Sequence, residues 1–135
     1  MVQAVIRHPD GDRVLVSETP GAGFQRLLGG KVEHGELSEE ALARELREEL
    51  GAEAEVGPLL GVLQNRFTYH GRPGHEVVLV HEVRLVDTSL YDCEEIPRVD
   101  RTDNRALWRS LTDPPPVPLY AEGWETLVRP GGPPP

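Results

Sequence analysis

The chain has 135 residues, of which 38% are hydrophobic and 27% charged, and its formal net charge is −9. These values indicate one globular domain and argue against an intrinsically disordered chain. The net charge also argues against a binder of nucleic-acid polymers, because such binding needs many cationic side chains to neutralise phosphates. A small polyphosphate ligand stays compatible with it, since a bound divalent cation can reverse the local charge of a site.

The sequence holds a single cysteine, Cys93, which can form neither an internal disulfide nor a cysteine-based zinc site. We therefore expect a reducing compartment, the cytoplasm. The apolar run 2–6 is too short for a signal sequence, and no segment approaches the ~18 apolar residues of a membrane span. We accordingly expect no membrane partner.

Three strands are predicted in the first 28 residues. Residues 2–7 and 14–18 are β-rich and flank His8-Pro9-Asp10-Gly11, a turn sequence that predicts a hairpin between them. Residues 24–28 form the third predicted strand, which ends at the pair Gly29-Gly30.

The clearest helix signal runs from Ser38 to Gly51. Ser38 is the predicted N-cap, the acids after it suit the positive end of the helix dipole, and Gly51 suits the position that follows a helix. Between them Leu42, Leu46 and Leu50 recur every four residues, which is the spacing of one apolar helix face.

The second half of the chain again alternates between strands and loops. Strands are predicted over 59–67 and 76–86, and the second is apolar on both faces, which is typical of a central strand. The glycine- and proline-rich segment 68–75 between them is predicted as a loop.

Residues 87–104 are predicted as a second loop, 105–109 as a last strand and 119–128 as a terminal helix. Residues 130–135 contain only proline and glycine and are expected to be a disordered tail. This mixed order of elements predicts an α/β sandwich in a single domain over 1–129.

Three carboxylates gather on the predicted helix. Glu45, Glu48 and Glu49 fall within an arc of about 100°. A solvated helix with ion pairs four residues apart would explain some of these charges. However, Glu45 and Glu49 are like charges at that spacing, which destabilises a helix, and clustered carboxylates suit a hard cation such as Mg²⁺ or Mn²⁺.

The residues before the helix decide between these interpretations. The segment GKVEHGELSEEALARELREELGA begins at Gly30, with Glu36 after five intervening residues and Arg44 after seven more. It resembles the Nudix box, G-x5-E-x7-R-E-U-x-E-E-x-G-U with U an aliphatic residue, at every fixed position. Its last position, Ala52, is smaller than the usual aliphatic residue.

The resemblance implies both a fold and a function. The fold is α/β (α+β), a Nudix-type α/β/α sandwich with a central mixed β-sheet. The function is a divalent-metal-dependent hydrolase that uses Mg²⁺ or Mn²⁺ to cleave the diphosphate of a small nucleoside diphosphate linked to another group. Members of that family are often dimers, so the resemblance also raises a homodimer, on which the residues themselves say nothing.

The resemblance also implies roles for individual residues. Glu45, Glu48 and Glu49 would supply oxygens to the metal, and the backbone carbonyl of Gly29 would add another. Glycine at Gly29 and Gly30 lets the backbone come close to ions and phosphates, because no Cβ stands in the way.

Two further roles concern charge and proton transfer. Glu36 and Arg44 are expected to form an ion pair that supports the loop against the helix. A carboxylate must take the proton from the attacking water, and the resemblance leaves two candidates, Glu45 or an acid in the loop before the last strand. The acids considered in that loop are Glu94, Glu95 and Asp103, of which Asp103 is favoured.

The substrate is less well defined by the sequence. The candidates for base stacking are Phe24, Phe67, Tyr69 and Trp108, although core packing would also explain each. The candidates for contacts with phosphate or a carboxylate are Arg26, Arg66, His70 and Arg72, although solvation would also explain each. Tyr69 lies seventeen residues after Ala52, as in diadenosine polyphosphate hydrolases, whereas other subfamily markers are absent. A second hypothesis is a catalytically inactive Nudix-fold nucleotide-binding or sensor domain, which usually shows a degraded box.

Overall fold

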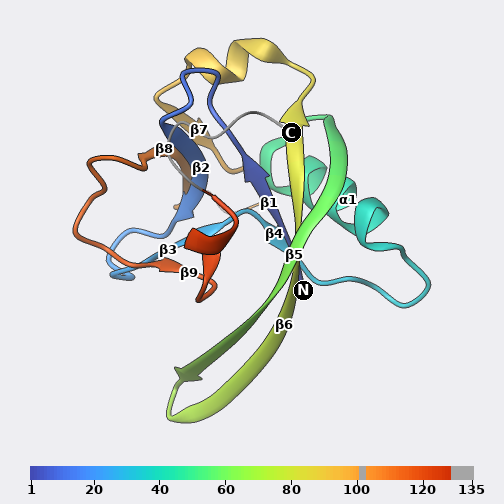
Figure 1. The fold of residues 1–135 in the computed structure, drawn as a ribbon, viewed down its shortest axis with the longest axis vertical. Helices are drawn as coiled ribbons and strands as arrows, with labels where there is room; N and C mark the ends of the chain where they lie inside the picture. The colour runs from blue at the N-terminus through green and yellow to red at the C-terminus, as the bar shows by residue number, and fades with distance from the viewer. Residues whose placement is uncertain (101–102, 129–135) are drawn as a thin grey trace.

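The computed structural model describes residues 1–100 and 103–128. The elements in chain order are β1 (Val2–Ile6), β2 (Arg13–Glu18), β3 (Gln25–Leu27), β4 (Gly29–Gly30), α1 (Ser38–Leu50), β5 (Ala54–Tyr69), β6 (Arg72–Leu85), η1 (Thr88–Asp92), β7 (Glu95–Pro97), β8 (Arg105–Ser110), β9 (Leu119–Tyr120) and η2 (Trp124–Thr126) (Figure 1). The predicted tail lies outside the described residues.

The strands form two mixed sheets. One has four strands in the order β4-β1-β6-β5, and the other has five in the order β7-β8-β2-β3-β9. In the first sheet β1 runs parallel to β6, and α1 packs on the sheet through contacts with β1, β4 and β5. The predicted mixed α+β class is confirmed, with its strands divided between two sheets.

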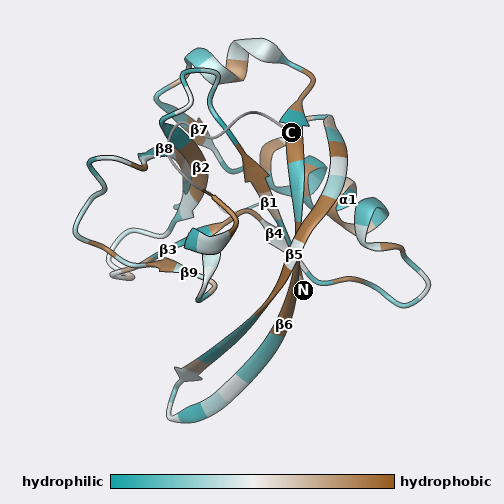
Figure 2. Ribbon diagram, viewed as in Figure 1, coloured by the Kyte–Doolittle hydropathy of each residue, from teal (hydrophilic) through white to brown (hydrophobic). Residues whose placement is uncertain are grey.

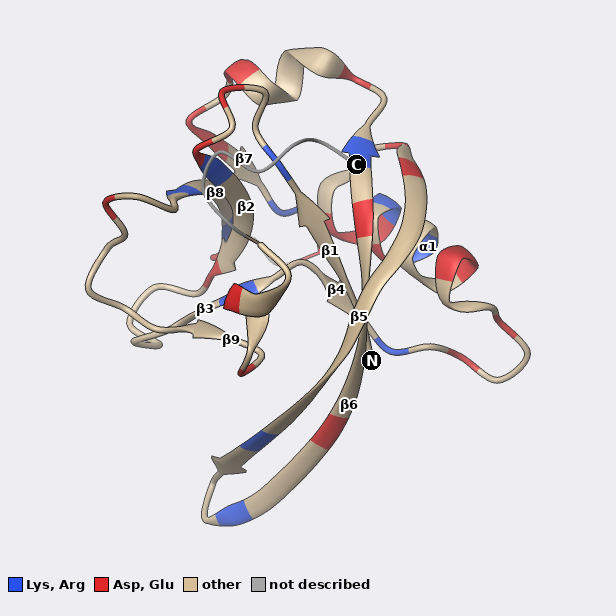
Figure 3. Cartoon of the chain, in the orientation of Figure 1, with Lys and Arg blue, Asp and Glu red and all other residues tan. Residues whose placement is uncertain are grey.

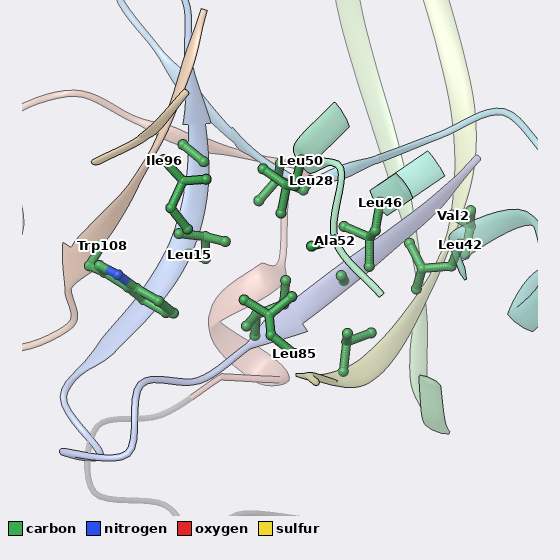
Figure 4. Close-up of a cluster of buried hydrophobic side chains, with 14 of the residues drawn as sticks. Val2, Leu15, Leu28, Leu42, Leu46, Leu50, Ala52, Leu85, Ile96 and Trp108 are labelled. Carbon is green, nitrogen blue, oxygen red and sulfur yellow. The ribbon is translucent and has the colours of Figure 1, made fainter. Parts of the chain in front are cut away.

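The hydrophobic core has two parts. The first joins the apolar face of α1 to β1 and to side chains of the second sheet such as Leu15 and Trp108 (Figure 4). The second lies around Val5, Val78 and Leu119. All of β1 is buried and most of it is apolar (Figure 2), because the strand has a neighbour on each side and packed layers on both faces.

The predicted hairpin over 2–18 is wrong except for one bridge. Only Arg7 and Val14 pair across the turn, since β1 lies in the first sheet and β2 in the second. The turn residues specify a reversal of the chain, whereas the buried surface of β1 decides its strand partners. The turn therefore joins the two sheets.

The predicted loop 68–75 is also wrong. β5 and β6 stay paired as far as Tyr69 and Arg72, and the turn between them is only His70-Gly71, with φ of 50° and 75°. Positive φ at both central residues favours a tight hairpin turn. The outer part of this hairpin, residues 64–77, extends beyond the other strands of both sheets (Figure 1). We call it the arm.

The predicted terminal helix 119–128 is wrong as well. Residues 119–120 form β9, parallel to β3, and a short 3₁₀ helix covers Trp124–Thr126. Gly123, with a φ of 87°, interrupts the helical conformation between them. The loop 87–104 likewise contains the 3₁₀ helix η1 and the strand β7. Among the described residues, no helix is long and apolar enough to cross a membrane.

A buried carboxylate in β6 predicts a pH dependence of stability. Glu82 is 5% exposed, lies 3.3 Å from the Arg7 guanidinium, and its pKa is raised from the ordinary 4.5 because burial outweighs the attraction of Arg7. The unfolded chain therefore releases this proton at a lower pH than the folded chain. The contribution of Glu82 to folding stability is thus highest below pH 4.5. It falls as the pH rises from there through the folded pKa.

Glu82→Gln should remove this dependence. In urea denaturation, the unfolding free energy of the wild type relative to Glu82→Gln should decrease between pH 4.5 and neutral pH. A difference that stays constant over this interval would show that Glu82 has the same pKa in both states.

Candidate active site

The helix α1 begins and ends on specific side-chain and backbone contacts. Its N-cap is Leu37, whose N–H donates to Glu40 Oε1 at 2.9 Å. The predicted N-cap Ser38 is wrong by one residue, because its hydroxyl pairs instead with Nε2 of buried His81 at 2.8 Å. The predicted end at Gly51 is confirmed by its left-handed φ of 64°. The Ser38–His81 hydrogen bond fixes the first turn of α1 to β6, and Gly51 ends the helix.

Glu45 lies directly against the double glycine. A Cβ on Gly30 would stand 2.3 Å from the Glu45 carboxyl carbon and 2.5 Å from both of its oxygens. The Glu45 side chain is 15% exposed, and burial raises its pKa despite a hydrogen bond of 3.1 Å from Arg44. The absence of a side chain at Gly30 therefore provides the space for this carboxylate.

Glu49 is the most deeply buried acid of the helix. It is 3% exposed, and burial raises its pKa to about 8, with Glu45 and Asp100 acting in the same direction. Arg98, 3.6 Å away, and a hydrogen bond with the backbone of Gly29 oppose this rise. Burial therefore outweighs the attraction of Arg98 and favours the neutral form of Glu49.

Arg44 organises the loop in front of the helix. It binds both oxygens of Glu36 at 2.8 and 2.9 Å and donates to the Lys31 carbonyl at 2.9 Å. The same guanidinium lowers the pKa of Glu36 to about 2. The ion pair predicted from the sequence is thus present, and it ties the loop to the helix.

Glu48 differs from the other two carboxylates. Its side chain is 55% exposed, and both oxygens lie 3.3 Å from Arg44 Nη1. Of these three carboxylates of α1, Glu45 and Glu49 are therefore shielded and Glu48 faces solvent; Figure 3 shows the charged residues along the helix.

The loop before β8 supplies two residues that sequence reasoning missed. The Val99 N–H donates to the Glu49 carbonyl at 2.8 Å, which brings Arg98 and Asp100 to the helix. Arg98 also binds Asp100 at 2.7 Å. The only sequence signal was that Asp100 belongs to the acidic loop.

The predicted acids of this loop lie elsewhere. Asp103 is exposed, and none of the contacts of Glu45 or Glu49 involves it. Glu95 in β7 pairs with Arg105 in β8, and Glu94 is exposed.

The residues of this site fit a divalent cation by their chemistry. In the described part of the chain, no three Asp, Glu, His or Cys side chains stand close enough together to hold a metal ion. Nevertheless, Glu45 and Glu49 offer oxygen ligands beside a glycine backbone, and carboxylate oxygens are the ligands that a hard cation prefers.

Four of the predicted substrate contacts lie in different places. Arg26 binds Glu76 at 2.7 Å at the base of the arm, and Phe24 packs edge-on against Tyr120 at 5.8 Å. The other two lie on the arm. Arg66 lines a hollow there, and Tyr69 is 68% exposed beside the turn.

Comparison with known proteins identifies a domain family. The NUDIX domain family model matches residues 2–127. A CTP pyrophosphohydrolase of Escherichia coli K12 is 48% identical over 60 residues, which cover 42% of this chain and 44% of that protein. The match therefore spans less than half of that relative.

Solved structures resemble the whole chain. The MutT NUDIX hydrolase of Burkholderia pseudomallei has a TM-score of 0.69 and 30% identity, with 93% of this chain and 92% of that chain covered. The E. coli ORF135 protein has a TM-score of 0.57 and 28% identity, covering 94% of this chain and 83% of that chain.

Proposed function

The chain belongs to the NUDIX domain family, and from this we propose that it is a divalent-metal-dependent hydrolase of a nucleoside diphosphate linked to another group. The observation that carries the proposal is the buried pair Glu45 and Glu49 against the double glycine of β4. Mg²⁺ or Mn²⁺ is the proposed cofactor, because carboxylate oxygens are the ligands that these cations prefer.

Each residue of the site has a proposed task. Glu45, Glu48 and Glu49 would hold the cation, with the Gly29 carbonyl as a further ligand, and the Glu36–Arg44 ion pair would keep the loop in place. A bound cation would neutralise phosphate charge and lower the pKa of water.

Glu45 is the proposed proton acceptor for the attacking water. Its carboxylate lies directly against Gly30, next to the position proposed for the cation and its bound water. Asp100 is the alternative acid from the loop, because it lies near both Glu45 and Glu49, whereas Asp103 has no contact with them. Variants of Asp100 and Asp103 would separate the two loop acids.

The experiment is a hydrolysis panel with Mg²⁺ and with Mn²⁺. The panel contains nucleoside triphosphates, oxidised deoxynucleotides, ADP-ribose, nucleotide sugars and dinucleoside polyphosphates, and CTP comes first because a relative bears the name CTP pyrophosphohydrolase. We expect at least one compound to be cleaved and EDTA to stop the reaction.

The control lies on the same helix. Glu48→Gln combined with Glu49→Gln should remove activity, whereas Glu39→Gln, the same change at an exposed residue of the first turn, should leave it. If nucleotides bind but no compound is cleaved, the chain is the alternative, a catalytically inactive nucleotide-binding or sensor domain.

A further inference from the structure

A hollow of about 660 Å³, wide open to solvent, lies beside the arm. Phe67 and Gly74 of the arm line it together with Glu122 from the segment after β9. The hollow therefore joins a protruding hairpin to a segment far away in the sequence.

The aromatic ring in the hollow is held flat on the opposite strand. Phe67 pairs with Gly74 across the hairpin, and a Cβ on Gly74 would stand 2.2–2.8 Å from the Phe67 ring atoms. The ring therefore occupies the space that a side chain at Gly74 would fill, and the residue remains 42% exposed. An exposed aromatic face of this kind stacks on planar ligands such as nucleobases.

The wall carrying Glu122 is anchored to the arm by a polar network. Buried Asn65 accepts a hydrogen bond from the Glu122 backbone N–H at 3.4 Å and donates to Glu76 at 3.1 Å. Arg26 of β3 binds the same Glu76 oxygen at 2.7 Å. These contacts place Glu122 next to Phe67 and connect both to the second sheet.

The side chain of Glu122 is free to recognise a ligand. It is exposed, and in the described part of the molecule it forms no ion pair. An ionised carboxylate only accepts hydrogen bonds, so it suits a ligand edge that carries an amino group and disfavours one that carries a carbonyl oxygen. Arg66, which lines the same hollow, suits a phosphorylated ligand.

We propose that this hollow binds the nucleobase of the substrate, with Phe67 stacking on the base and Glu122 accepting a hydrogen bond from its amino group. The inference rests on the proposed function and names its substrate class, the nucleotides of amino-bearing bases such as cytosine and adenine. Glu76, Asn65 and Arg26 are positioning residues that hold the two walls together.

The test measures binding and does not require cleavage. NMR titrations of the wild type with CMP, AMP, UMP and IMP should give Kd values about tenfold lower for CMP and AMP, the difference expected for one charge-assisted hydrogen bond. In Glu122→Gln the Kd values of CMP and UMP should become similar, because an amide can also donate to a carbonyl oxygen. Phe67→Ala should weaken binding of all four.

Two matched variants separate the loss of these ligand contacts from a non-specific disturbance of the fold. Glu125→Gln changes an exposed acid of the same segment, and Val62→Ala shortens an exposed apolar side chain of β5; both should bind like the wild type. The inference is overturned if no monophosphate binds or if the wild type does not prefer CMP and AMP over UMP and IMP. It is also overturned if Glu122→Gln retains this preference. Absence of hydrolysis with binding and preference intact would overturn only the proposed function.

Discussion

Glu49→Gln is expected to lower turnover by about a hundredfold or more, because it removes a proposed metal ligand and leaves the shape of the side chain unchanged. The same substitution should not destabilise the metal-free protein. Glu49 is buried near Glu45 and Asp100, with Arg98 as its opposing charge. A neutral amide avoids the cost of burying this carboxylate.

The sign of the pH dependence follows from the same burial. The folded pKa of Glu49 is about 8 and its ordinary value is 4.5, so the unfolded chain loses the proton first as the pH rises. The metal-free wild type should therefore lose stability between these two values, and Glu49→Gln should lose less. Urea denaturation in the presence of EDTA, repeated across this pH range, measures the free energy of unfolding of both proteins.

Without metal, Glu49→Gln should be the more stable of the two proteins, and addition of Mg²⁺ should make the wild type the more stable one. A ligand that binds only the folded state at 100 times its Kd adds about 2.7 kcal/mol of stability. The wild type should gain from this effect and Glu49→Gln should gain much less. Full activity in Glu49→Gln, or an equal Mg²⁺ shift in both proteins, would remove Glu49 from the metal site.

The helix and its charges could be predicted because their signals are local. The leucine spacing and Gly51 define α1, and the pair Glu36–Arg44 is implied by the resemblance of this segment to the Nudix box. The N-cap was missed by one residue because buried His81 engages the Ser38 hydroxyl. That competition depends on a strand more than forty residues away.

The remaining parts of the site depend on contacts between distant segments. Arg98 and Asp100 reach α1 because Val99 pairs with the Glu49 backbone, and the loop has no periodicity that would predict this. Residues 68–75 at the tip of the arm are predicted as a loop because glycine and proline are typical of loops, whereas a two-residue turn at His70-Gly71 keeps the strands paired. Glu122 lies in a segment predicted as helix, which concealed its contact with the arm.

Gly30→Ala is expected to reduce activity about tenfold to a hundredfold with little change in stability. Gly30 does not have the positive φ that would strain an alanine backbone, and Gly→Ala at a compatible position raises stability by ~0.4–1 kcal/mol through the unfolded state. The three atoms nearest to the added Cβ all belong to the Glu45 carboxylate, at 2.3–2.5 Å. This side chain can move away at low cost, and it would then leave the position proposed for metal binding.

A double-mutant cycle tests whether Gly30 acts through Glu45. Mg²⁺ affinity, measured as the shift in unfolding temperature, should fall in Gly30→Ala and in Glu45→Ala, and the two losses should not add in the double variant. Additive losses would mean that the new methyl group disturbs something other than Glu45. Because the three nearest atoms belong to a side-chain carboxylate, a strongly destabilised Gly30→Ala would likewise contradict the assignment. Glycine at this position is then explained by the room that a metal-binding carboxylate needs.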